Sequence, residues 1–496
     1  MRYNLSTMPE EELSPATFGS AFKAFIDAMV AQANASQTSP LLDRLRAHVG
    51  TDPTQLPVIA EEFDSFEQPN VQVAIDNYLS GDGRQADLIG VAAENKRFMA
   101  LSLSDLLSRR SALVEGPADY VNFHLADDRV LACVQFGLYL IRDGDARLVA
   151  FVCGPSDRGG PRTRLRVEVI AAERDQCQSF LAELATGMRR LNVYRGHVIS
   201  LSPGQMGMGS QTLVAFHSLP RIQRADVILP ENLLEQIERQ TVVFAEHSQR
   251  LLESGRSLKR GLLLFGPPGI GKTLTVMYLI GRMPGRTVIL TTGRGMGMIQ
   301  TVAQMARLLA PSMVVLEDVD LIAQERGQPF QQTGPLLFEL LNEMDGLRDD
   351  CDVIFVLTTN RPDMLEPALA ARPGRIDLAT ELPLPDADAR RRLFDLYARG
   401  LALDAVDFDA LVARTVGASP AYIKELLRKA AVLAATQATR VSGLHFEAAL
   451  EELNAGGQLA QRLLGFRVAD QSGPSSEAKM SPAQPTGYPV AWSARG

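Results

Sequence analysis

The residues most able to do chemistry form a glycine-rich segment that ends in a lysine and a threonine. The segment reads Gly266-Pro267-Pro268-Gly269-Ile270-Gly271-Lys272-Thr273. Glycines let the backbone curl so that successive N–H groups point at phosphate oxygens, and a following helix N-terminus adds about half a positive charge. In this pattern Lys272 reaches the β- and γ-phosphates and the Thr273 hydroxyl ligates Mg²⁺. The segment therefore predicts a phosphate-binding P-loop for a nucleotide.

The flanks of this loop have the secondary structure that such a site requires. Gly261–Phe265 is a short apolar run that is typical of a buried strand. Leu274–Ile280 continues as a helix, so Leu274 joins the predicted nucleotide-contacting residues. We therefore expect a strand, a glycine loop and a helix in that order.

Acidic and amide side chains follow two later apolar runs. Met313–Leu316 ends in Glu317 and Asp318, and Val353–Leu357 is followed closely by Asn360. In P-loop enzymes an acid at such a strand end holds Mg²⁺ through its water shell, and a second acid accepts a proton from the attacking water. An amide at the neighbouring strand end orients that water. This constellation predicts nucleotide hydrolysis.

Composition limits the other classes of function. The 496-residue chain has a net charge of −8, which provides no general field for nucleic acid. It lacks an apolar run of 18 residues, a secretory-type N-terminus and an H-E-x-x-H motif, so neither a membrane span, a signal peptide nor a fused zinc protease is expected. Its four cysteines have no CxxC spacing, which indicates reduced thiols and a cytoplasmic location.

Patterning along the chain predicts five parts. The region before the P-loop should be a separate α+β domain, with a hairpin of strands at 131–141 and 146–153, a half-buried strand around 165–169, a helix at 177–191 and a last strand at 193–201. The five predicted parts are a helical or flexible segment (1–66), the α+β domain (67–220), an α/β nucleotide-binding subdomain (221–385), a helical lid (386–466) and a disordered tail (467–496).

The ordered set of motifs resembles that of AAA ATPases. The stretches that carry the resemblance are Gly266–Thr273, Val314–Asp318, Leu337–Leu347, Arg361–Asp377 and Gly417–Tyr422. The ordered agreement around these stretches covers about 225–455, roughly half of the chain, and does not include the N-terminal domain. The resemblance implies an αβα nucleotide-binding core, a helical lid, ATP and Mg²⁺ as cofactors, and assembly into a ring, commonly a hexamer.

The same resemblance assigns roles to single residues. It makes Glu317 the Mg²⁺-side acid, Asp318 the catalytic base and Asn360 a sensor of the γ-phosphate. It makes Arg372 and Arg375 arginine fingers that enter the site of the neighbouring subunit, although a structural salt bridge is the alternative for either. Gly417 and Ala418 belong to the lid segment near the adenine.

Three features depart from the usual pattern. The acids stand in the order Glu317-Asp318, where most of the family has Asp-Glu; the mitochondrial translocases of the Rieske iron–sulfur protein have a similar order. The segment Gly293–Ile299 carries methionines and no aromatic residue, unlike the peptide-gripping loop of many unfoldases. One extra residue lies between Leu369 and Arg372. The order of the acids is compatible with slow hydrolysis, and the loop without an aromatic residue weakens a threading mechanism. The extra residue bears on the assignment of Arg372 and Arg375 as fingers.

Three functions stay open on this basis. The first is an ATP-driven ring that remodels, translocates or assembles a protein partner, which the N-terminal domain would recognise. The second is a nucleotide-gated scaffold with slow hydrolysis. The third, a nucleic-acid motor, is disfavoured because the basic clusters are short and the overall charge is negative.

Overall fold

The chain is described from a computed structural model. Its contacts divide the chain into two compact units, the first comprising 1–266 and 271–382, and the second 267–270 and 383–496. The described residues are 22–29, 40–92, 102–108, 114–155, 164–203, 212–291, 297–320, 335–346, 348–365 and 375–455. Within these ranges every helix is too short or too polar to span a lipid bilayer.

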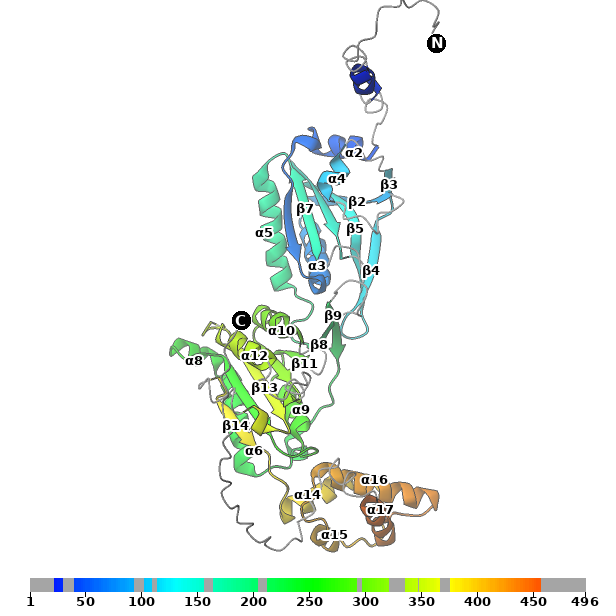
Figure 1. Ribbon diagram of the computed structural model, residues 1–496, viewed down its shortest axis with the longest axis vertical. Coiled ribbons are helices and arrows are strands. Elements are labelled where there is room, and N and C mark those ends of the chain that lie inside the picture. The colour runs from blue at the N-terminus through cyan, green and yellow to red at the C-terminus, as the bar shows by residue number, and fades with distance from the viewer. Residues whose placement is uncertain are drawn as a thin grey trace, which may run out of the picture. The chain divides into compact units, whose positions relative to one another are not determined.

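The first sheet is antiparallel and lies in the N-terminal part of the first unit (Figure 1). Its strand order is β1-β7-β6-β5-β2-β3, and β4 pairs with the first half of β5. The strands are β1 (Ile59–Phe63), β2 (Arg84–Ala92), β3 (Val114–Gly116), β4 (Asp119–His124), β5 (Val130–Asp143), β6 (Ala146–Cys153) and β7 (Leu165–Ala171).

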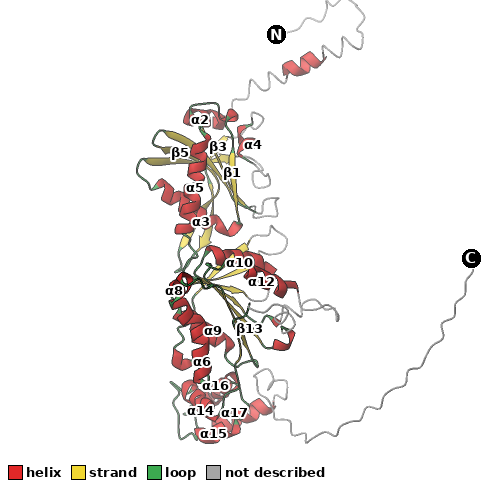
Figure 2. Cartoon of the chain, turned by 90° about the vertical axis from the view of Figure 1, so that its left-hand side faces the viewer, coloured by secondary structure: helices red, strands yellow, loops and turns green. Residues whose placement is uncertain are grey.

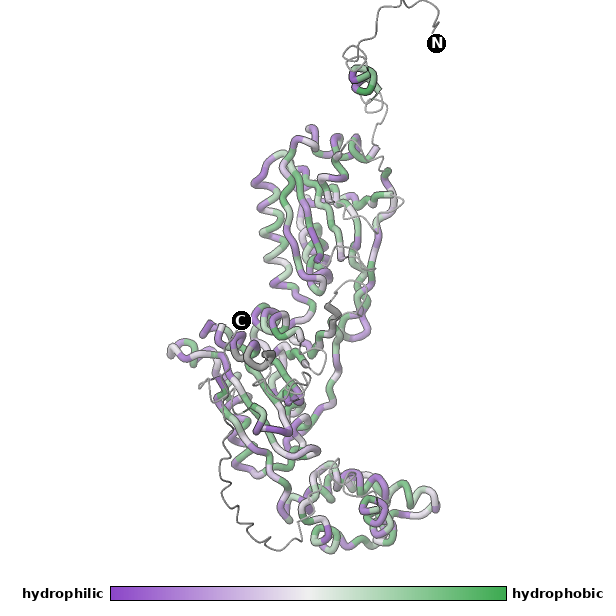
Figure 3. The backbone as a smooth tube through the Cα atoms, viewed as in Figure 1, coloured by the Kyte–Doolittle hydropathy of each residue, from purple (hydrophilic) through white to green (hydrophobic). Residues whose placement is uncertain are grey.

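Helices cover both faces of this sheet, and each face has its own apolar cluster. Helices α3 (Gln68–Leu79) and α5 (Arg174–Arg190) pack on one face, whereas α2 (Pro40–Val49) and α4 (Leu103–Leu107) pack on the other. Figure 3 shows green, apolar stretches along the strands, while α5 alternates between purple and green turns. This alternation is typical of a helix with one apolar face turned to a sheet.

The predicted hairpin and the predicted helix are confirmed. The strand predicted around 165–169 is also present, but the prediction that it is only half-buried is wrong. β5 and β6 pair antiparallel on either side of a turn at Gly144, and α5 covers the expected helical segment. Strand β7 is buried on both faces, and even Glu168 is only 1% exposed. The reason is the second layer of helices, because α2 and α4 cover the face that the alternating pattern would leave in solvent.

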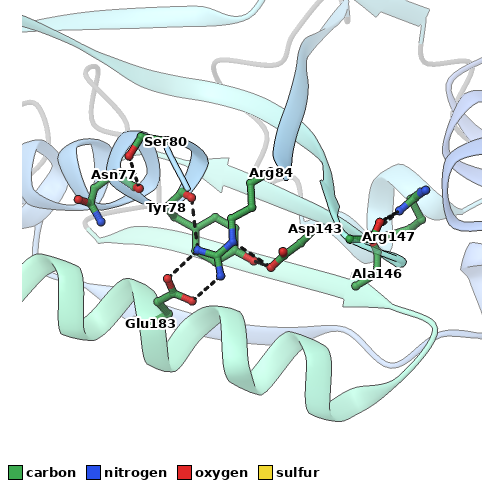
Figure 4. A network of polar contacts seen from close by, with 9 residues as sticks. Asn77, Tyr78, Ser80, Arg84, Asp143, Ala146, Arg147 and Glu183 are labelled. Atoms are coloured by element: carbon green, nitrogen blue, oxygen red, sulfur yellow. Dashed lines mark hydrogen bonds and ion pairs between the residues drawn. The ribbon is translucent and has the colours of Figure 1, made fainter. Parts of the chain in front are cut away.

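A polar clamp ties α3 and α5 to the hairpin (Figure 4). Arg84, at the start of β2, donates to Asp143 at 3.1 Å and makes two parallel hydrogen bonds to Glu183 at 2.7 and 3.0 Å. Its guanidinium lies 3.9 Å from the ring centroid of Tyr78, whose hydroxyl donates to Asp143 at 2.6 Å. One cation thus connects a strand, a hairpin and two helices.

The second sheet is mostly parallel and forms the αβα core. Its order is β14-β10-β13-β12-β11-β8-β9, and only the β8–β9 pair is antiparallel. Figure 2 shows these strands between α6 and α9 on one side and α10 and α12 on the other. The strands are β8 (Val198–Pro203), β9 (Thr212–His217), β10 (Arg260–Phe265), β11 (Thr287–Thr291), β12 (Ser312–Leu316), β13 (Val353–Thr359) and β14 (Leu378–Glu381).

Apolar side chains from both neighbouring layers bury this sheet. One face packs on α10 (Ile299–Leu308) and α12 (Pro335–Asp345), and the same cluster includes Phe66 and Tyr194 from the N-terminal part of the chain. Helices α6 (Glu231–Glu238) and α9 (Lys272–Arg282) carry further buried residues. A π-helical turn, Arg239–Val243, follows α6, and the short helices α7 (Phe244–Glu246) and α8 (Ser248–Glu253) lead on towards β10.

The two predicted borders of the N-terminal domain, after 66 and after 220, are both displaced. Strand β1 lies before the first border, yet it pairs with β7 over Ile59↔Val169 to Phe63↔Leu165. Strands β8 and β9 lie before the second border, yet β8 pairs with β11 in the core sheet. The strand expected at 193–201 therefore belongs to the nucleotide-binding core, because Ile199 and Leu201 find their buried partners there.

The second unit is helical, as expected for a lid. Its helices are α14 (Ala387–Tyr397), α15 (Phe408–Arg414), α16 (Pro420–Thr436) and α17 (Gly443–Ala455). Polar caps start three of them, since Asp386, Asp407 and Ser419 each accept a backbone N–H of the first turn. The α/β fold class, with an αβα core, a helical lid and a preceding α+β domain, is confirmed.

Candidate nucleotide-binding and hydrolysis site

The site lies at the carboxyl ends of three parallel strands, β10, β12 and β13. The register pairs Phe265 with Thr359 and Leu316 with Leu357, so the three strands end at the same edge of the sheet. Ligands of open α/β sheets bind at this edge. Lys272, the acids Glu317 and Asp318, and Asn360 each follow one of these strands, which explains how segments 40–90 residues apart come together.

The P-loop backbone adopts positive φ angles at its glycines. Gly269 and Gly271 have φ of 74° and 105°, values that L side chains rarely adopt. Helix α9 begins directly at Lys272, and the Thr275 hydroxyl donates to Gly271 O at 3.0 Å. Thr273, in the first turn, is exposed. A helix N-terminus directly after a glycine-rich loop is the arrangement that binds phosphate.

A chain of hydrogen bonds joins three of the predicted residues. The Lys272 ammonium donates to Gly266 O at 3.0 Å and to Asn360 Oδ1 at 2.7 Å. The Asn360 amide donates in turn to Asp318 Oδ1 at 3.2 Å. Lys272 is only 7% exposed, and this burial lowers its pKa, while the charges of Asp318 and Asp320 partly offset the effect. The predicted phosphate-binding cation, the predicted sensor amide and the predicted base are thus joined by hydrogen bonds.

The backbone at Asp318 turns sharply after β12. Asp318 has φ of 51°, in the left-handed region, and its N–H donates to the Thr358 hydroxyl at 3.1 Å. The next N–H, that of Val319, donates to Thr358 O at 3.0 Å. Aspartate tolerates this conformation better than most residues, although it still costs free energy. The turn directs the Asp318 carboxylate to Asn360, while Glu317 stays half-buried at the strand end.

Asp320 is a further site residue that the sequence pattern does not reveal. It is 5% exposed, and its Oδ1 accepts the Thr359 hydroxyl at 2.8 Å and the Asn360 N–H at 3.2 Å. It therefore fixes the backbone that carries the sensor amide. The only signal in the sequence is a third acid two residues after Asp318, and its role depends on the distant strand β13.

The donors present here fit Mg²⁺. Magnesium keeps several waters and takes one or two carboxylates plus phosphate oxygens. Among the described residues no three His, Cys, Asp or Glu side chains form a ready metal cluster. Thr273 would supply a hydroxyl, and Glu317 a carboxylate, to such an ion.

Arg375 lies at the opposite end of strand β10 from the P-loop. Its guanidinium forms an ion pair with Asp345, at the end of α12, and its backbone oxygen lies 2.1 Å from where a Cβ on Gly261 would stand. Asp377 anchors the segment, because its carboxylate pairs with Arg260 at 2.6 Å and accepts the Gly261 N–H, while its own N–H donates to Gly261 O. The six-residue strand separates the two ends by roughly 17 Å. Arg372 lies outside the described residues.

The lid contacts of the P-loop come from the second unit, to which Pro267–Ile270 belong. In that unit the N–H of Ala421 donates to Gly269 O at 3.1 Å. The predicted adenine-side residues Gly417 and Ala418 lie just before α16, with φ of 82° at the glycine and the alanine fully buried. The lid segment and the loop tip thus lie together within one unit.

The methionine-rich loop falls mostly outside the described residues, including Met296. Met298 is described and packs against the apolar cluster of the core. This contact supports a structural role for Met298.

Strand order, P-loop and the Lys272–Asn360–Asp318 chain define a P-loop nucleoside triphosphatase. Residues 262–384 match the model of the ATPase family associated with various cellular activities (AAA). The chain therefore contains an AAA ATPase domain, whose cofactors are ATP and Mg²⁺ and whose reaction is ATP hydrolysis.

Curated relatives extend this similarity. The chain is 32% identical over 277 residues to the ATP-dependent zinc metalloprotease FtsH 3 of Synechocystis sp., a match that covers 53% of this chain and 43% of that protein. It is 33% identical over 234 residues to FtsH of Thermus thermophilus, covering 45% and 37%. A match to FtsH 3 of Sphaerobacter thermophilus, at 33% over 277 residues, covers 53% and 56%. The chain thus spans about two fifths to just over half of these relatives.

Proposed function

We propose that the chain is an ATP-driven ring protein that remodels, translocates or assembles a protein partner. The observation that carries this proposal is the hydrogen-bonded chain of Lys272, Asn360 and Asp318 at one sheet edge. It links the group that binds the γ-phosphate to the carboxylate that would accept a proton from water. A protein that only stored nucleotide would not need this connection.

The position of Arg375 supports assembly into a ring. An arginine side chain is much shorter than the roughly 17 Å that separate the two ends of β10, so Arg375 is too far to serve its own P-loop. In a head-to-tail ring the same face of one subunit meets the nucleotide site of the next. We propose a hexamer, in which Arg375 and Arg372 act on the neighbouring nucleotide.

A protein partner is favoured by the relatives and by the architecture. The relatives are named ATP-dependent metalloproteases, which act on proteins. The described N-terminal sheet has its own apolar clusters and packs against the core through Phe66 and Tyr194. We propose that this region recognises the partner and that the core supplies the movement.

Exchanged acids favour slow turnover, so a nucleotide-gated scaffold is the alternative. Asp318 is one methylene shorter than the glutamate that is usual in the family, and its left-handed backbone moves the carboxylate to Asn360. A scaffold would assemble and function fully with a non-hydrolysable ATP analogue. A remodelling ATPase would assemble but fail to process its partner.

Subunit mixing tests the shared site. Asp318→Asn removes the base and leaves the arginine finger intact, whereas Arg375→Ala removes the finger and leaves the nucleotide site intact. Each variant alone should have little phosphate release. In random mixed rings about one quarter of the sites would combine an intact base with an intact neighbouring finger, so turnover should recover to about one quarter. Wild type mixed with Lys272→Ala is the dilution control.

The outcomes separate the two ideas within this proposal. Recovery in the mixture supports a finger supplied by the neighbour. No recovery, with rings that assemble normally, contradicts it. Activity of Arg375→Ala alone at the wild-type rate contradicts any role of Arg375 in hydrolysis and leaves the Asp345 ion pair as its function.

We also propose a cytoplasmic location. All four cysteines are free, and Cys133, Cys153 and Cys177 are buried. Burial raises the pKa of the Cys133 thiol to about 12 and that of Cys177 to about 11, so neither forms a reactive thiolate near neutral pH. A reducing compartment suits such a set of thiols. Localisation of the tagged full-length chain tests this.

A further inference from the structure

A cavity of about 240 Å³ lies where the N-terminal sheet meets the edge of the ATPase sheet. Strands β4 and β9 both contribute to its wall, and Figure 1 shows the end of β4 running down towards β9. Four aromatic side chains line it: Phe66, Phe123, Tyr194 and Phe216. The cavity is remote from the P-loop, and no step of ATP hydrolysis uses it.

The wall of this cavity selects for an uncharged ligand. Among the described residues that line it there is no Lys, Arg, Asp or Glu. The polar side chains are the amides of Gln68, Asn122 and Gln135, the hydroxyls of Ser65 and Tyr194, and the imidazole of His124. A carboxylate or ammonium placed there would lose its hydration without gaining a counter-charge. Aromatic walls with a few amides instead suit an apolar side chain attached to a peptide-like backbone.

One of these amides is buried and only partly used. Gln68 is 2% exposed, and its amide N–H groups donate to Val134 O and Gln135 Oε1, both at 2.9 Å. Its carbonyl oxygen accepts no hydrogen bond from the described residues, although the side chain lines the cavity. This oxygen is therefore available to accept an N–H group of a ligand.

Both strands that line the cavity are edge strands among the described residues. β4 pairs only with β5, and β9 pairs only with β8. Val121 and Phe123 of β4, and Val214 and Phe216 of β9, contribute side chains to the wall. An edge strand offers a row of backbone donors and acceptors to another extended chain, and neighbouring pockets then read alternate side chains.

We propose that this cavity binds an extended, uncharged polypeptide segment that pairs with β4 and inserts an apolar side chain between Phe123 and Phe216. This identifies the partner class as an exposed apolar β-type segment, and its biological meaning rests on the proposed remodelling function. Because β9 shares a sheet with the P-loop strand β10, the segment contacts both the recognition region and the sheet that carries the nucleotide site.

Short synthetic peptides test this binding without any ATP turnover. The probes alternate threonine and valine around a central Phe, Leu or Asp, and one Phe-centred probe carries N-methyl groups that block strand pairing. Fluorescence anisotropy is measured on full-length Lys272→Ala protein, so that hydrolysis plays no part. Phe- and Leu-centred peptides should bind with a Kd at least about tenfold below that of the Asp-centred and N-methylated peptides.

Two variants of β4 place the site. Phe123→Asp puts a carboxylate into the cavity wall and should weaken the Phe-centred peptide by about tenfold or more. Tyr120→Asp makes a similar change at a 57% exposed position of the same strand that does not line the cavity, and should leave the Kd unchanged. Circular dichroism checks that both variants fold.

The outcomes decide the proposal in each case. Equal binding of the Phe- and Asp-centred peptides, or no binding of any probe, overturns it. An equal loss in the two variants also overturns it, because that would reflect strand damage. If Phe123→Asp does not fold, the comparison of the N-methylated and unmodified peptides on the Lys272→Ala protein decides alone. Peptide binding without ATP-dependent remodelling would retain the site and refute the proposed function.

Discussion

Replacing Asp320 by alanine should displace Asn360, the proposed sensor, and so lower turnover more than it lowers the affinity for ATP. The carboxylate is 5% exposed and accepts two hydrogen bonds, from the Thr359 hydroxyl and the Asn360 N–H. Each buried donor left unpaired costs about 1–3 kcal/mol, so the two together cost about 2–6 kcal/mol. If about 1.4 kcal/mol of this cost or more acts on the hydrolysis barrier, because Asn360 is displaced, turnover falls by about tenfold or more. Lys272, the proposed ligand of the nucleotide phosphates, keeps its contact with Gly266 O.

Three measurements on the same preparation check this prediction. Urea denaturation gives the free energy of unfolding, a fluorescent ATP analogue gives affinity, and single-turnover phosphate release gives the chemical step. Asp320→Asn is the control, because it retains an acceptor oxygen and should lose about 1 kcal/mol or less. The reasoning is refuted if Asp320→Ala has the unfolding free energy and the turnover of wild type.

The remaining predictions concern single positions. Gly261→Ala should slow turnover and spare ATP affinity, because its Cβ would meet Arg375 O at 2.1 Å; Gly281→Ala, which meets nothing within 4 Å, is the matched control for both assays. Arg84→Met should lower the free energy of unfolding by about 2 kcal/mol in urea, since its two carboxylate partners lose a shared cation; an unchanged midpoint would show that the clamp is dispensable. Burial lowers the pKa of His48 below 6.5, so the unfolded chain binds more protons there. Stability should therefore fall as the pH drops from about 6.5, and a pH series on His48→Gln should lack that slope.

The sequence predicts which side chains meet at the candidate site better than it predicts the domain borders. The P-loop, the acids after β12 and the amide after β13 are short motifs whose residue types are tied to local backbone demands. Parallel strands bring their ends to one edge, so the meeting of Lys272, Asn360 and Asp318 follows once each run is taken as a strand.

Local sequence patterns do not predict which distant segments pair with each other. The alternating pattern of β8 is compatible with either sheet, and only its register with β11 assigns it to the core. The pattern of β7 likewise says nothing of the second helical layer that buries its other face. Asp320 acts through Thr359 and Asn360, about 40 residues away, and no local spacing reveals that contact.

The membership of β8 and β9 in the core sheet determines where this chain can be divided. A fragment that ends at 220 would carry a hairpin whose apolar residues, among them Ile199 and Leu201, have lost their cover. In the complementary fragment, strand β11 would lose its pairing with β8 and become an exposed apolar edge strand. Such an edge can associate with other copies of the fragment. A better place to divide the chain is between α5 and β8, in the turn around 191–197. The main interaction lost there would be the hydrogen bond from the Tyr194 hydroxyl to Phe66 O.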